Sequence, residues 1–362
     1  MGQTNSAPVT TKRTNLWQND TYSVGASCMQ GWRIHMEDAH TCYLQLPGDP
    51  QCAYFSVFDG HGGNRVAKHA GRHLHEHLIS QPEYGRRDIK GAIRQAFLSL
   101  DAEMQKELKA NVPDQCAPIN PLVLNKQSPE DKIYGSSHLN LKQRKATGDM
   151  HARTGSLGDE LAGSTGIIIL IKDQMLYCGN VGDSRAVCCS LGIANSLSTD
   201  HKPTLRKEKE RIMAAGGWVD ANRVNGNLAL SRAFGDFVFK RNSEKPPEKQ
   251  IVSASPDVHV RRISPEEDEF VIIGCDGVWD VMTNQEVVSF VRLRLGRGFS
   301  PDKICEELMM RCLAPNCQTN GLGCDNMTVV LVCFLNGQPF SELQRRCSRP
   351  CKGGPAIDIL GV

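Results

Sequence analysis

The chain has no apolar run that could span a membrane. Its longest apolar stretches, Gly166–Ile171 and Val329–Leu335, are far shorter than the ~20 residues that a membrane-spanning helix needs. The chain also lacks an excess of either charge, because 42 basic and 40 acidic residues leave a net charge of +2. We therefore expect neither nucleic acid nor an anionic membrane as a bulk partner. These two features predict a soluble protein.

The sequence gives little sign of a disulfide-stabilised secreted fold, although it contains 15 cysteines. The number is odd, the chain of 362 residues is long, and its start does not resemble a secretory leader. We therefore expect reduced thiols and a location in the cytoplasm, and also in the nucleus. The length is compatible with two domains or with one large β-rich domain.

The first residues carry a lipidation signal. Gly2 follows Met1, and Ser6 supplies the hydroxyl group of the N-myristoylation pattern. Such a start also arises by chance, so an unmodified terminus is the alternative. A single acyl chain gives only marginal, reversible membrane binding. We predict that residues 1–21 form a flexible segment that contacts a membrane only through a myristoyl group on Gly2.

The first candidate site is a strand that ends in an acidic, glycine-rich turn. The run Ala53–Phe58 is aromatic and β-branched, which predicts a buried strand. Asp59 follows it, and Gly60 lets an ion or a phosphate approach the backbone closely. His61 is the one residue of this stretch that can donate a proton near neutral pH. The stretch therefore predicts a carboxylate and a general acid at one edge of a sheet.

One basic and two acidic residues share the preceding segment. Arg33 presents a planar fork of donors that suits a phosphate group. Glu37 and Asp38 are adjacent carboxylates, and in an extended segment they point to opposite sides. We therefore expect one of them to touch an ion directly and the other to hold its water molecules. A charged surface strand is the alternative.

Two amphipathic helices are predicted after the glycine turn, at 64–80 and 92–108. The first contains four histidines, and two pairs of them have the i,i+4 spacing that can hold zinc. They are His69, His73, His75 and His77. No other type of ligand lies nearby in the sequence, and the histidines avoid the apolar positions. A solvated helix face is therefore the preferred interpretation.

Two segments lack an apolar period and are predicted to be disordered. The insert 111–161 is rich in proline and polar residues, and the tail 336–362 contains proline, glycine and arginine. Between them, a helix is expected at 206–215. The stretch 222–236 is rich in glycine, asparagine and basic residues, which would suit a flap beside a phosphate-bearing substrate.

Three closely spaced apolar runs follow the insert, at 163–171, 175–180 and 181–187. Their short connections predict antiparallel hairpins rather than βαβ units. Asp183 lies in a turn between two of these strands. Aspartate is common in turns for purely structural reasons, so Asp183 taken alone is not a site signal.

The pattern of an apolar strand beside an aspartate recurs twice more. Asp276 ends one such run, Asp280 follows four residues later, and Asp325 precedes the run Met327–Phe334. Antiparallel strands would allow Asp59, Asp276 and Asp325 to meet at one edge. Three carboxylates repel one another unless cations neutralise them, and oxygen ligands favour Mg²⁺ or Mn²⁺ over zinc. The pattern therefore favours a site for two metal ions over unrelated turns.

The motifs together resemble the type 2C, metal-dependent serine/threonine protein phosphatases. The resemblance covers about Tyr22–Phe334 apart from the insert, and the motifs follow the family's order. They are Arg33…Glu37-Asp38, Val57-Phe-Asp-Gly-His-Gly-Gly63, Gly182-Asp-Ser-Arg185, Ser231-Arg-Ala-Phe-Gly-Asp236, Asp276-Gly-Val-Trp-Asp280 and Asp325-Asn326. The resemblance implies an α+β fold, a four-layer αββα sandwich of two antiparallel sheets flanked by helices. A catalytic domain over 22–335 would carry a dinuclear metal site in the cleft at one end.

The resemblance also implies which residues bind the metal ions. Asp59 would bridge two Mg²⁺ or Mn²⁺ ions. Glu37 and the carbonyl group of Gly60 would complete the protein ligands of one ion, and Asp276 and Asp325 would hold the other. Some members of the family bind a weaker third metal at the positions of Asp183 and Asp280.

The remaining matched positions are those of the reaction itself. Asp38 would orient a metal-bound water, Arg33 would hold the phosphate, and His61 would protonate the leaving group. The implied activity is hydrolysis of phosphoserine and phosphothreonine in protein substrates, by direct attack of the metal-bridging water and without a phosphoenzyme. We expect the enzyme to be a monomer.

Two other functions and one other metal site are alternatives to this interpretation. Cys305 and Arg311 have the Cys-x₅-Arg spacing of cysteine-dependent phosphatases, but the apolar period around them predicts a helix with a core cysteine. A catalytically silent scaffold would lack an acidic ligand, and none is missing. Zinc held by Cys312, Cys317 and Cys324 is a weaker alternative, because no paired Cys-x₂-Cys is present.

Overall fold

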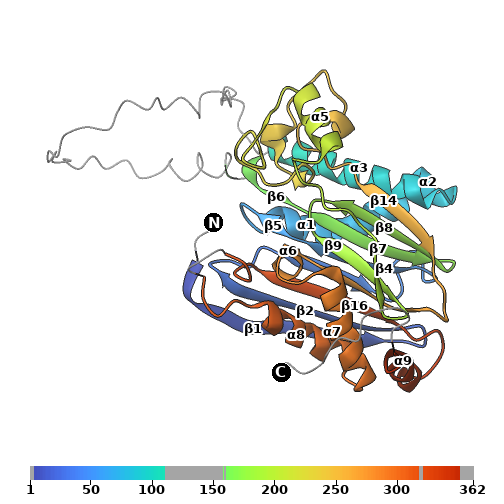
Figure 1. The fold of residues 1–362 in the computed structure, drawn as a ribbon. Helices are drawn as coiled ribbons and strands as arrows, with labels where there is room; N and C mark the ends of the chain where they lie inside the picture. The colour runs from blue at the N-terminus through green and yellow to red at the C-terminus, as the bar shows by residue number, and fades with distance from the viewer. Residues whose placement is uncertain (1–3, 111–157, 159, 318–320, 351–362) are drawn as a thin grey trace, which may run out of the picture.

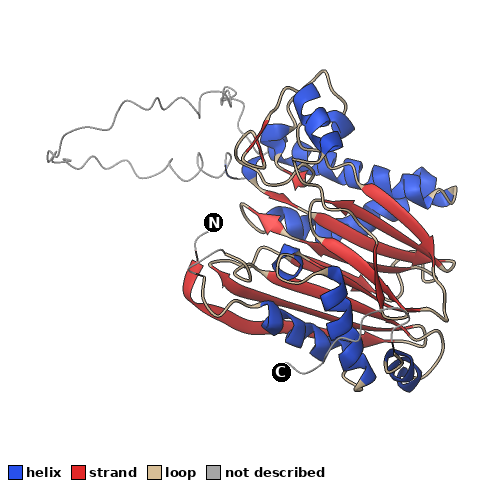
Figure 2. Ribbon diagram, viewed as in Figure 1, coloured by secondary structure: helices blue, strands red, loops and turns tan. Residues whose placement is uncertain are grey.

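Four layers of secondary structure make up the protein. The computed structural model describes residues 4–110, 158, 160–317 and 321–350. Two sheets pack face to face, and helices cover the outer face of each one (Figures 1 and 2). This is the predicted αββα sandwich.

The larger sheet has six antiparallel strands. Their spatial order is β1 (Thr4–Gln18), β2 (Tyr22–Arg33), β16 (Met327–Phe334), β15 (Asp268–Gly274), β9 (Arg185–Ser190) and β10 (Ile193–Ser196). The smaller sheet has the order β14 (Asp257–Arg262), β8 (Met175–Val181), β7 (Gly166–Lys172), β4 (Ala53–Phe58) and β3 (Ala39–Tyr43). The predicted hairpin of β7 and β8 is antiparallel, with Gly166 opposite Val181. The predicted hairpin is therefore confirmed for β7 and β8, but it is wrong for β8 and β9, which belong to different sheets.

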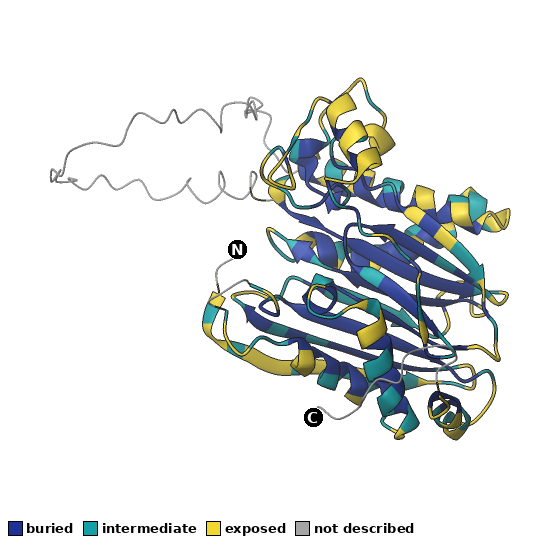
Figure 3. Ribbon diagram, in the orientation of Figure 1, coloured by how far each residue is buried: buried dark blue, intermediate teal, exposed yellow. Residues whose placement is uncertain are grey.

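Both faces of the central strands are buried, which explains why their sequences are almost continuously apolar. In β7, Ile167 and Ile169 belong to the core between the two sheets. Ile168 and Leu170 point the other way and pack beneath the helices. Side chains alternate between the faces of a strand, so one apolar run serves two cores. Figure 3 shows the resulting buried interior and the exposed outer faces of the helices.

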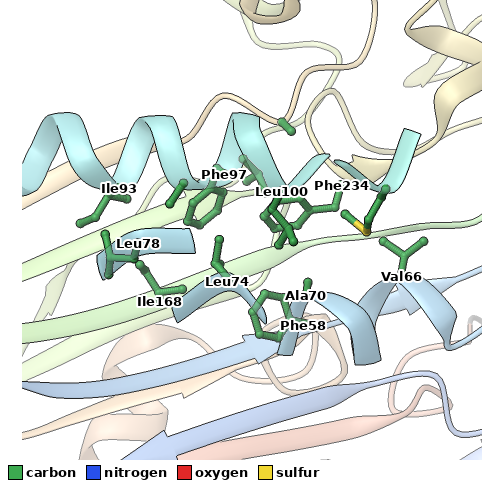
Figure 4. Close-up of a cluster of buried hydrophobic side chains, with 14 of the residues drawn as sticks. Phe58, Val66, Ala70, Leu74, Leu78, Ile93, Phe97, Leu100, Ile168 and Phe234 are labelled. Atoms are coloured by element: carbon green, nitrogen blue, oxygen red, sulfur yellow. The ribbon is translucent and has the colours of Figure 1, made fainter. Parts of the chain in front are cut away.

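Helices cover each sheet through an apolar stripe. The smaller sheet is covered by α1 (Arg65–Ser80), α2 (Pro82–Gly85) and α3 (Ile89–Ala110), and the larger by α7 (Asn284–Gly296), α8 (Pro301–Cys312) and α9 (Phe340–Cys347). In Figure 4, Leu74 and Leu78 of α1 lie between Phe97 of α3 and Ile168 of β7. The predicted helices 64–80 and 92–108 are confirmed as α1 and α3.

A small lobe stands above the sandwich in Figure 1, next to β6 (Gly163–Ser164), and is called the flap lobe (residues 205–253) below. Its elements are α5 (Arg206–Ala214), β11 (Val219–Asp220), β12 (Arg223–Val224), β13 (Phe234–Gly235), η2 (Phe237–Phe239) and η3 (Pro247–Lys249). It has a core of its own, in which Ile212, Val224 and Phe239 pack together. The stretch 222–236, predicted as a flap, lies in this lobe, and its Phe234 packs into the core beneath α1 and α3.

The two terminal predictions need correction. Residues 4–18 of the segment predicted to be flexible form β1, which pairs with β2 along its length. The prediction was wrong because an edge strand is held by backbone hydrogen bonds and needs no continuous apolar face. In the tail predicted to be disordered, residues 340–347 form α9, with Leu343 and Cys347 buried. Gly2, residues 111–157 and 159 of the insert, and residues 351–362 lie outside the described residues.

The thiol prediction is wrong for one pair. Cys317 and Cys324 form a disulfide, so they are not available with Cys312 as zinc ligands. The other cysteines in the described part of the chain are free, and most of them are buried. None of the helices described is long and apolar enough to cross a membrane.

Candidate active site

One cavity gathers most of the predicted site residues. It has a volume of about 520 Å³ and lies at one end of the sandwich. Eight of its lining residues are predicted site residues: Arg33, Glu37, Asp59, Gly60, His61, Asp183, Asp276 and Asp325. The structure therefore brings together acidic side chains that are far apart in the sequence.

The two sheets form opposite walls of this cavity. Asp59 follows β4 and Asp183 follows β8, so the smaller sheet supplies both carboxylates. Asp276 opens the short helix α6 (Asp276–Trp279) directly after β15, and Asp325 lies just before β16. Adjacent antiparallel strands β15 and β16 place the end of one beside the start of the other. The larger sheet thereby supplies the other two carboxylates.

The backbone of Gly60 also lines this cavity. The residue pairs with Ser164 and is buried, while Thr165 donates its amide to the carbonyl oxygen of Asp59 at 2.9 Å. A Cβ atom on Gly60 would lie 2.5 Å from the carbonyl oxygen of Glu37. Only glycine therefore allows the chain to pass so close to Glu37.

Burial and mutual repulsion dominate the electrostatics of the carboxylates. Burial raises the pKa of Asp59 well above its usual value, and the negative charges of Asp276 and Asp38 raise it further. Burial also raises the pKa of Asp276, together with the charges of Asp183 and Asp325. The folded chain therefore holds these acids in a place that disfavours their charged forms unless a cation joins them.

Asp38 lies behind the cavity rather than in its lining. Thr328 donates a hydrogen bond to Oδ2 of Asp38 at 2.7 Å, while Oδ1 is buried without a hydrogen-bond partner. Burial raises the pKa of Asp38 to about 7, and Asp325 and Glu37 add to the effect of burial. Glu37 itself faces the cavity, so the two neighbouring carboxylates do point to different places, as predicted.

Two basic side chains already pair with site carboxylates. Arg33 forms an ion pair with Asp325, and Lys202 forms one with Asp183. No three His, Cys, Asp or Glu side chains in the described ranges are gathered closely enough to bind one ion as they stand. Asp280 lies outside the main cavity and lines an adjacent open groove together with Arg185 and other residues.

His61 has a partner that the sequence interpretation missed. Its Nε2 atom lies 2.8 Å from Oδ2 of Asp236, a residue that is 1% exposed. Burial lowers the pKa of His61, but the charges of Asp236 and Asp183 outweigh burial, so the pKa is raised overall. The place of Asp236 in the Ser231–Asp236 motif was the available signal.

Asn326 is a second residue whose role was missed. Its side chain accepts the amide of Glu37 at 2.9 Å and donates to the carbonyl groups of Gln30 and His35 at 2.8 and 2.9 Å. It therefore fixes the loop that carries Glu37 to the start of β16. Its place in the Asp325-Asn326 motif was the sign of this in the sequence.

The rival cysteine site is excluded by its surroundings. Cys305 lies in α8 with no exposed surface, and its Sγ contacts the carbonyl oxygen of Gly25 at 3.5 Å. Burial raises the pKa of its thiol, which opposes formation of the nucleophilic thiolate. The prediction of a core cysteine is confirmed.

The histidines of α1 divide into two groups. His69 and His77 approach Glu103 of α3 at 3.8 and 3.2 Å on a partly exposed face. His75 is buried, and its ring lies 4.8 Å from that of Tyr43. The expectation that all four histidines avoid the core was wrong for His75, whose ring packs as an aromatic side chain.

Comparison with known proteins identifies the family. A family model described as protein phosphatase 2C matches residues 22–118 and 114–321. A probable protein phosphatase 2C of Caenorhabditis elegans, T23F11.1, is 47% identical over 350 residues, which cover 97% of this chain and 85% of the relative. Probable protein phosphatase 2C 21 of Arabidopsis thaliana is 39% identical and covers 94% of each chain.

A solved structure has the same fold. The serine-threonine phosphatase 2C of Toxoplasma gondii is 22% identical and superposes with a TM-score of 0.65, covering 92% of this chain and 100% of that one. At this identity the likeness shows the fold alone. Taken with the family model and the more similar relatives, it leads to one conclusion: the chain belongs to the protein phosphatase 2C family and is a serine/threonine protein phosphatase.

Proposed function

We propose that this chain hydrolyses phosphoserine and phosphothreonine with two divalent cations, Mg²⁺ or Mn²⁺, held in the cavity between the sheets. One observation carries the proposal. Carboxylates from both sheets, Asp59 and Asp183 on one side and Asp276 and Asp325 on the other, line a single cavity. Four such charges in one place need cations, and oxygen ligands favour hard ones.

The residues present fit a pair of such ions. The donors are carboxylate oxygens and the Gly60 carbonyl, with no thiol or imidazole among the proposed ligands. The buried Oδ1 of Asp38 lacks a hydrogen-bond donor, so it has capacity to accept from a water molecule. Arg33 and Lys202 now neutralise Asp325 and Asp183. On this proposal those two carboxylates exchange a basic side chain for an ion.

The proposed assignment gives Asp59 the bridging position, with Glu37 and Gly60 on one ion and Asp276 and Asp325 on the other. The bound ions would supply a nucleophilic hydroxide at neutral pH and neutralise charge on the phosphate. A third, weaker ion would need Asp183 and Asp280. The charge of Asp183 raises the pKa of Asp280, and the charge of Asp280 raises that of Asp276, which supports such a site, although Asp280 stands outside the main cavity.

Other side chains act on the substrate itself. Arg33, released from Asp325, would donate two parallel hydrogen bonds to the phosphate. Asp38 would orient the attacking water. The alkoxide of serine or threonine is a poor leaving group, and His61 would supply its proton, an effect typically worth about 10²–10⁴-fold in rate.

A phosphopeptide assay tests the proposal. We expect activity with Mg²⁺ or Mn²⁺, loss of activity with a chelator, and recovery when the metal is returned. A thiol alkylator should have little effect, because Cys305 is buried. Full activity in the presence of a chelator would contradict the proposal, and inactivation by the alkylator alone would favour the cysteine mechanism.

We also propose myristoylation of Gly2, a cytoplasmic and nuclear location with reversible membrane association, and a monomeric state. The sequence pattern at Gly2 and Ser6 supports the first of these. Mass spectrometry of the N-terminal peptide from cells, with Gly2→Ala as the control, tests the modification. Light scattering of the purified chain tests the monomeric state.

A further inference from the structure

A three-stranded mini-sheet at the cavity joins His61 to Asp236. Its strands stand in the order β13 (Phe234–Gly235), β6 (Gly163–Ser164) and β5 (Gly60–His61). Gly163 pairs with His61 on one side and with Gly235 on the other. His61 and the residue after β13, Asp236, therefore flank one glycine.

The missing side chain at Gly163 lets these two residues meet. A Cβ atom built on Gly163 would lie 2.5 Å from Nε2 of His61 and closer still to Oδ2 of Asp236. Real Cβ atoms do not approach other atoms so closely, so any other residue would push the pair apart. The 2.8 Å contact between Nε2 and Oδ2 passes directly over the backbone of Gly163.

Asp236 is itself fixed on several sides. Its backbone has φ of +51°, a conformation that Asp and Asn adopt more readily than most residues. Its amide donates to the carbonyl oxygen of Ala162 at 2.9 Å. One residue earlier, the amide of Gly235 donates to Oδ1 of Asp101 on α3 at 2.8 Å. The carboxylate thus has a defined position before any substrate binds.

We propose that Asp236 is the positioning residue of His61. The inference rests on the proposed role of His61 as the general acid. Because Nε2 is hydrogen-bonded to Asp236, Nδ1 is the ring nitrogen that can donate a proton to the substrate. In hydrolases where an aspartate orients a catalytic histidine, one ring nitrogen likewise binds the aspartate and the other transfers the proton.

The proton transfer then balances as follows. A water molecule gives up one proton to solvent and the oxygen of the resulting hydroxide bonds to phosphorus, while the bond between phosphorus and serine or threonine Oγ breaks and its electron pair stays on Oγ. The Nδ1 proton of the imidazolium passes to Oγ. Nε2 keeps the proton that it shares with Asp236, so the ring ends neutral in a single tautomer.

Leaving-group dependence provides the test, with Asp236→Asn as the variant because asparagine tolerates the backbone conformation. Two substrates are compared in the metal-loaded enzyme: a phosphothreonine peptide, and p-nitrophenyl phosphate, whose leaving group needs less protonation. We expect Asp236→Asn to lower kcat for the peptide by roughly 10- to 100-fold and kcat for the aryl phosphate far less, as part of the general-acid effect. His61→Gln should show the same selectivity.

A double variant separates positioning from an independent effect. If Asp236 acts through His61, the enzyme with both His61→Gln and Asp236→Asn should be no slower than His61→Gln alone. Multiplied losses in the double variant, or equal losses of Asp236→Asn on both substrates, would overturn the inference. If His61→Gln itself shows no selectivity, the acid role in the proposed function fails, and the inference fails with it.

Asp268→Asn serves as a matched control. Asp268 is likewise buried and charged, and Arg261 donates to it at 2.6 Å, but it belongs to β15 away from the cavity. Its variant should lose stability without selectivity between the two substrates. A second measurement uses the wild-type enzyme labelled with ¹⁵N-histidine. A slowly exchanging Nε2–H signal that disappears in His61→Gln supports the inference, and the absence of such a signal contradicts it.

Discussion

Acidic residues gather in two regions of this molecule, and the two regions treat them in opposite ways. Within the flap lobe, Glu208 is 3% exposed and receives hydrogen bonds from Arg232 at 2.7 Å and from Ser231 at 2.6 Å. Burial alone would raise the pKa of Glu208, but Arg232 and Arg211 lower it overall. In the catalytic cavity, the pKa of Asp59 is raised well above its usual value.

The difference lies in the neighbours. Arginines surround Glu208 in the flap lobe. Its charged form is therefore paired within the fold, and the ion pairs help to hold α5 in place. Other acids surround Asp59, so its charged form needs a bound cation to neutralise it. Burial of an acid is thus no sign of function by itself. The absence of a basic partner beside it is the more informative observation.

The largest expected effect comes from Asp59→Asn. Loss of the proposed bridging carboxylate should reduce kcat/KM by about 10³-fold or more, because metal-ion catalysis supplies several kcal/mol. At the same time, thermal unfolding in a chelator should occur at an equal or higher temperature, because one repelling charge is gone. Near-normal turnover, or a clearly less stable protein in a chelator, would contradict the view that Asp59, unlike Glu208, lies among acids that repel it.

Arg33→Ala should have the next largest effect. Removal of the proposed phosphate donor should lower kcat/KM by about 10²-fold, comparable to loss of one oxyanion donor. Arg33→Lys should recover only part of the activity, because an ammonium group cannot donate in a planar fork. Inhibition by inorganic phosphate should weaken in parallel, and unchanged inhibition by phosphate would contradict this role.

Glu208→Gln should affect stability rather than chemistry. The change leaves Arg211 and Arg232 without their buried partner, and breaking such a pair costs about 3–5 kcal/mol in the free energy of unfolding. Urea denaturation measures this. Glu210→Gln on the same helix is the matched control, because its pair with Arg206 is exposed and should contribute less than about 1 kcal/mol. Equal losses for the two variants would show that burial does not matter here.

The smallest expected effect concerns pH. Asp38 has a usual pKa of 3.8, which the fold raises to about 7, so the folded chain keeps a proton that the unfolded chain loses. The contribution of Asp38 to stability is therefore complete below pH 4 and is lost as the pH rises from about 4 to 7. In a chelator, the unfolding temperature should fall over this range, and Asp38→Asn should flatten the curve. An identical slope in both proteins would refute the assignment to Asp38.

Much of the sandwich could be predicted from the sequence because its strands are apolar on both faces. The run at β7 and the strand before Asp59 are examples in which composition alone indicates burial. The convergence of Asp59, Asp276 and Asp325 was also predictable, since each stands at the end of such a strand. Chemical type and position along a strand were enough in these cases.

Other features depend on partners far away in the chain, and the sequence gave weaker signals for them. The strand β1 is largely polar and is recognisable only beside β2. Helix α9 did carry a signal, since Pro339 precedes Phe340 and an apolar residue recurs at Leu343 and Cys347, but the segment is short. The role of Asp236 depends on Gly163 and therefore on a sheet of three strands that no local pattern reveals.

The layer of aliphatic side chains between the two sheets determines more than stability. Asp59 stands on one sheet and Asp276 on the other, so the thickness of this layer sets the distance between the two carboxylates. Ile169 and Val330 belong to the layer and do not line the cavity. A change of volume at either position alters the separation of the two walls, whereas the outer helices can be remodelled without that consequence. The thickness of the sandwich interior therefore sets the distance between the two walls of the candidate active site.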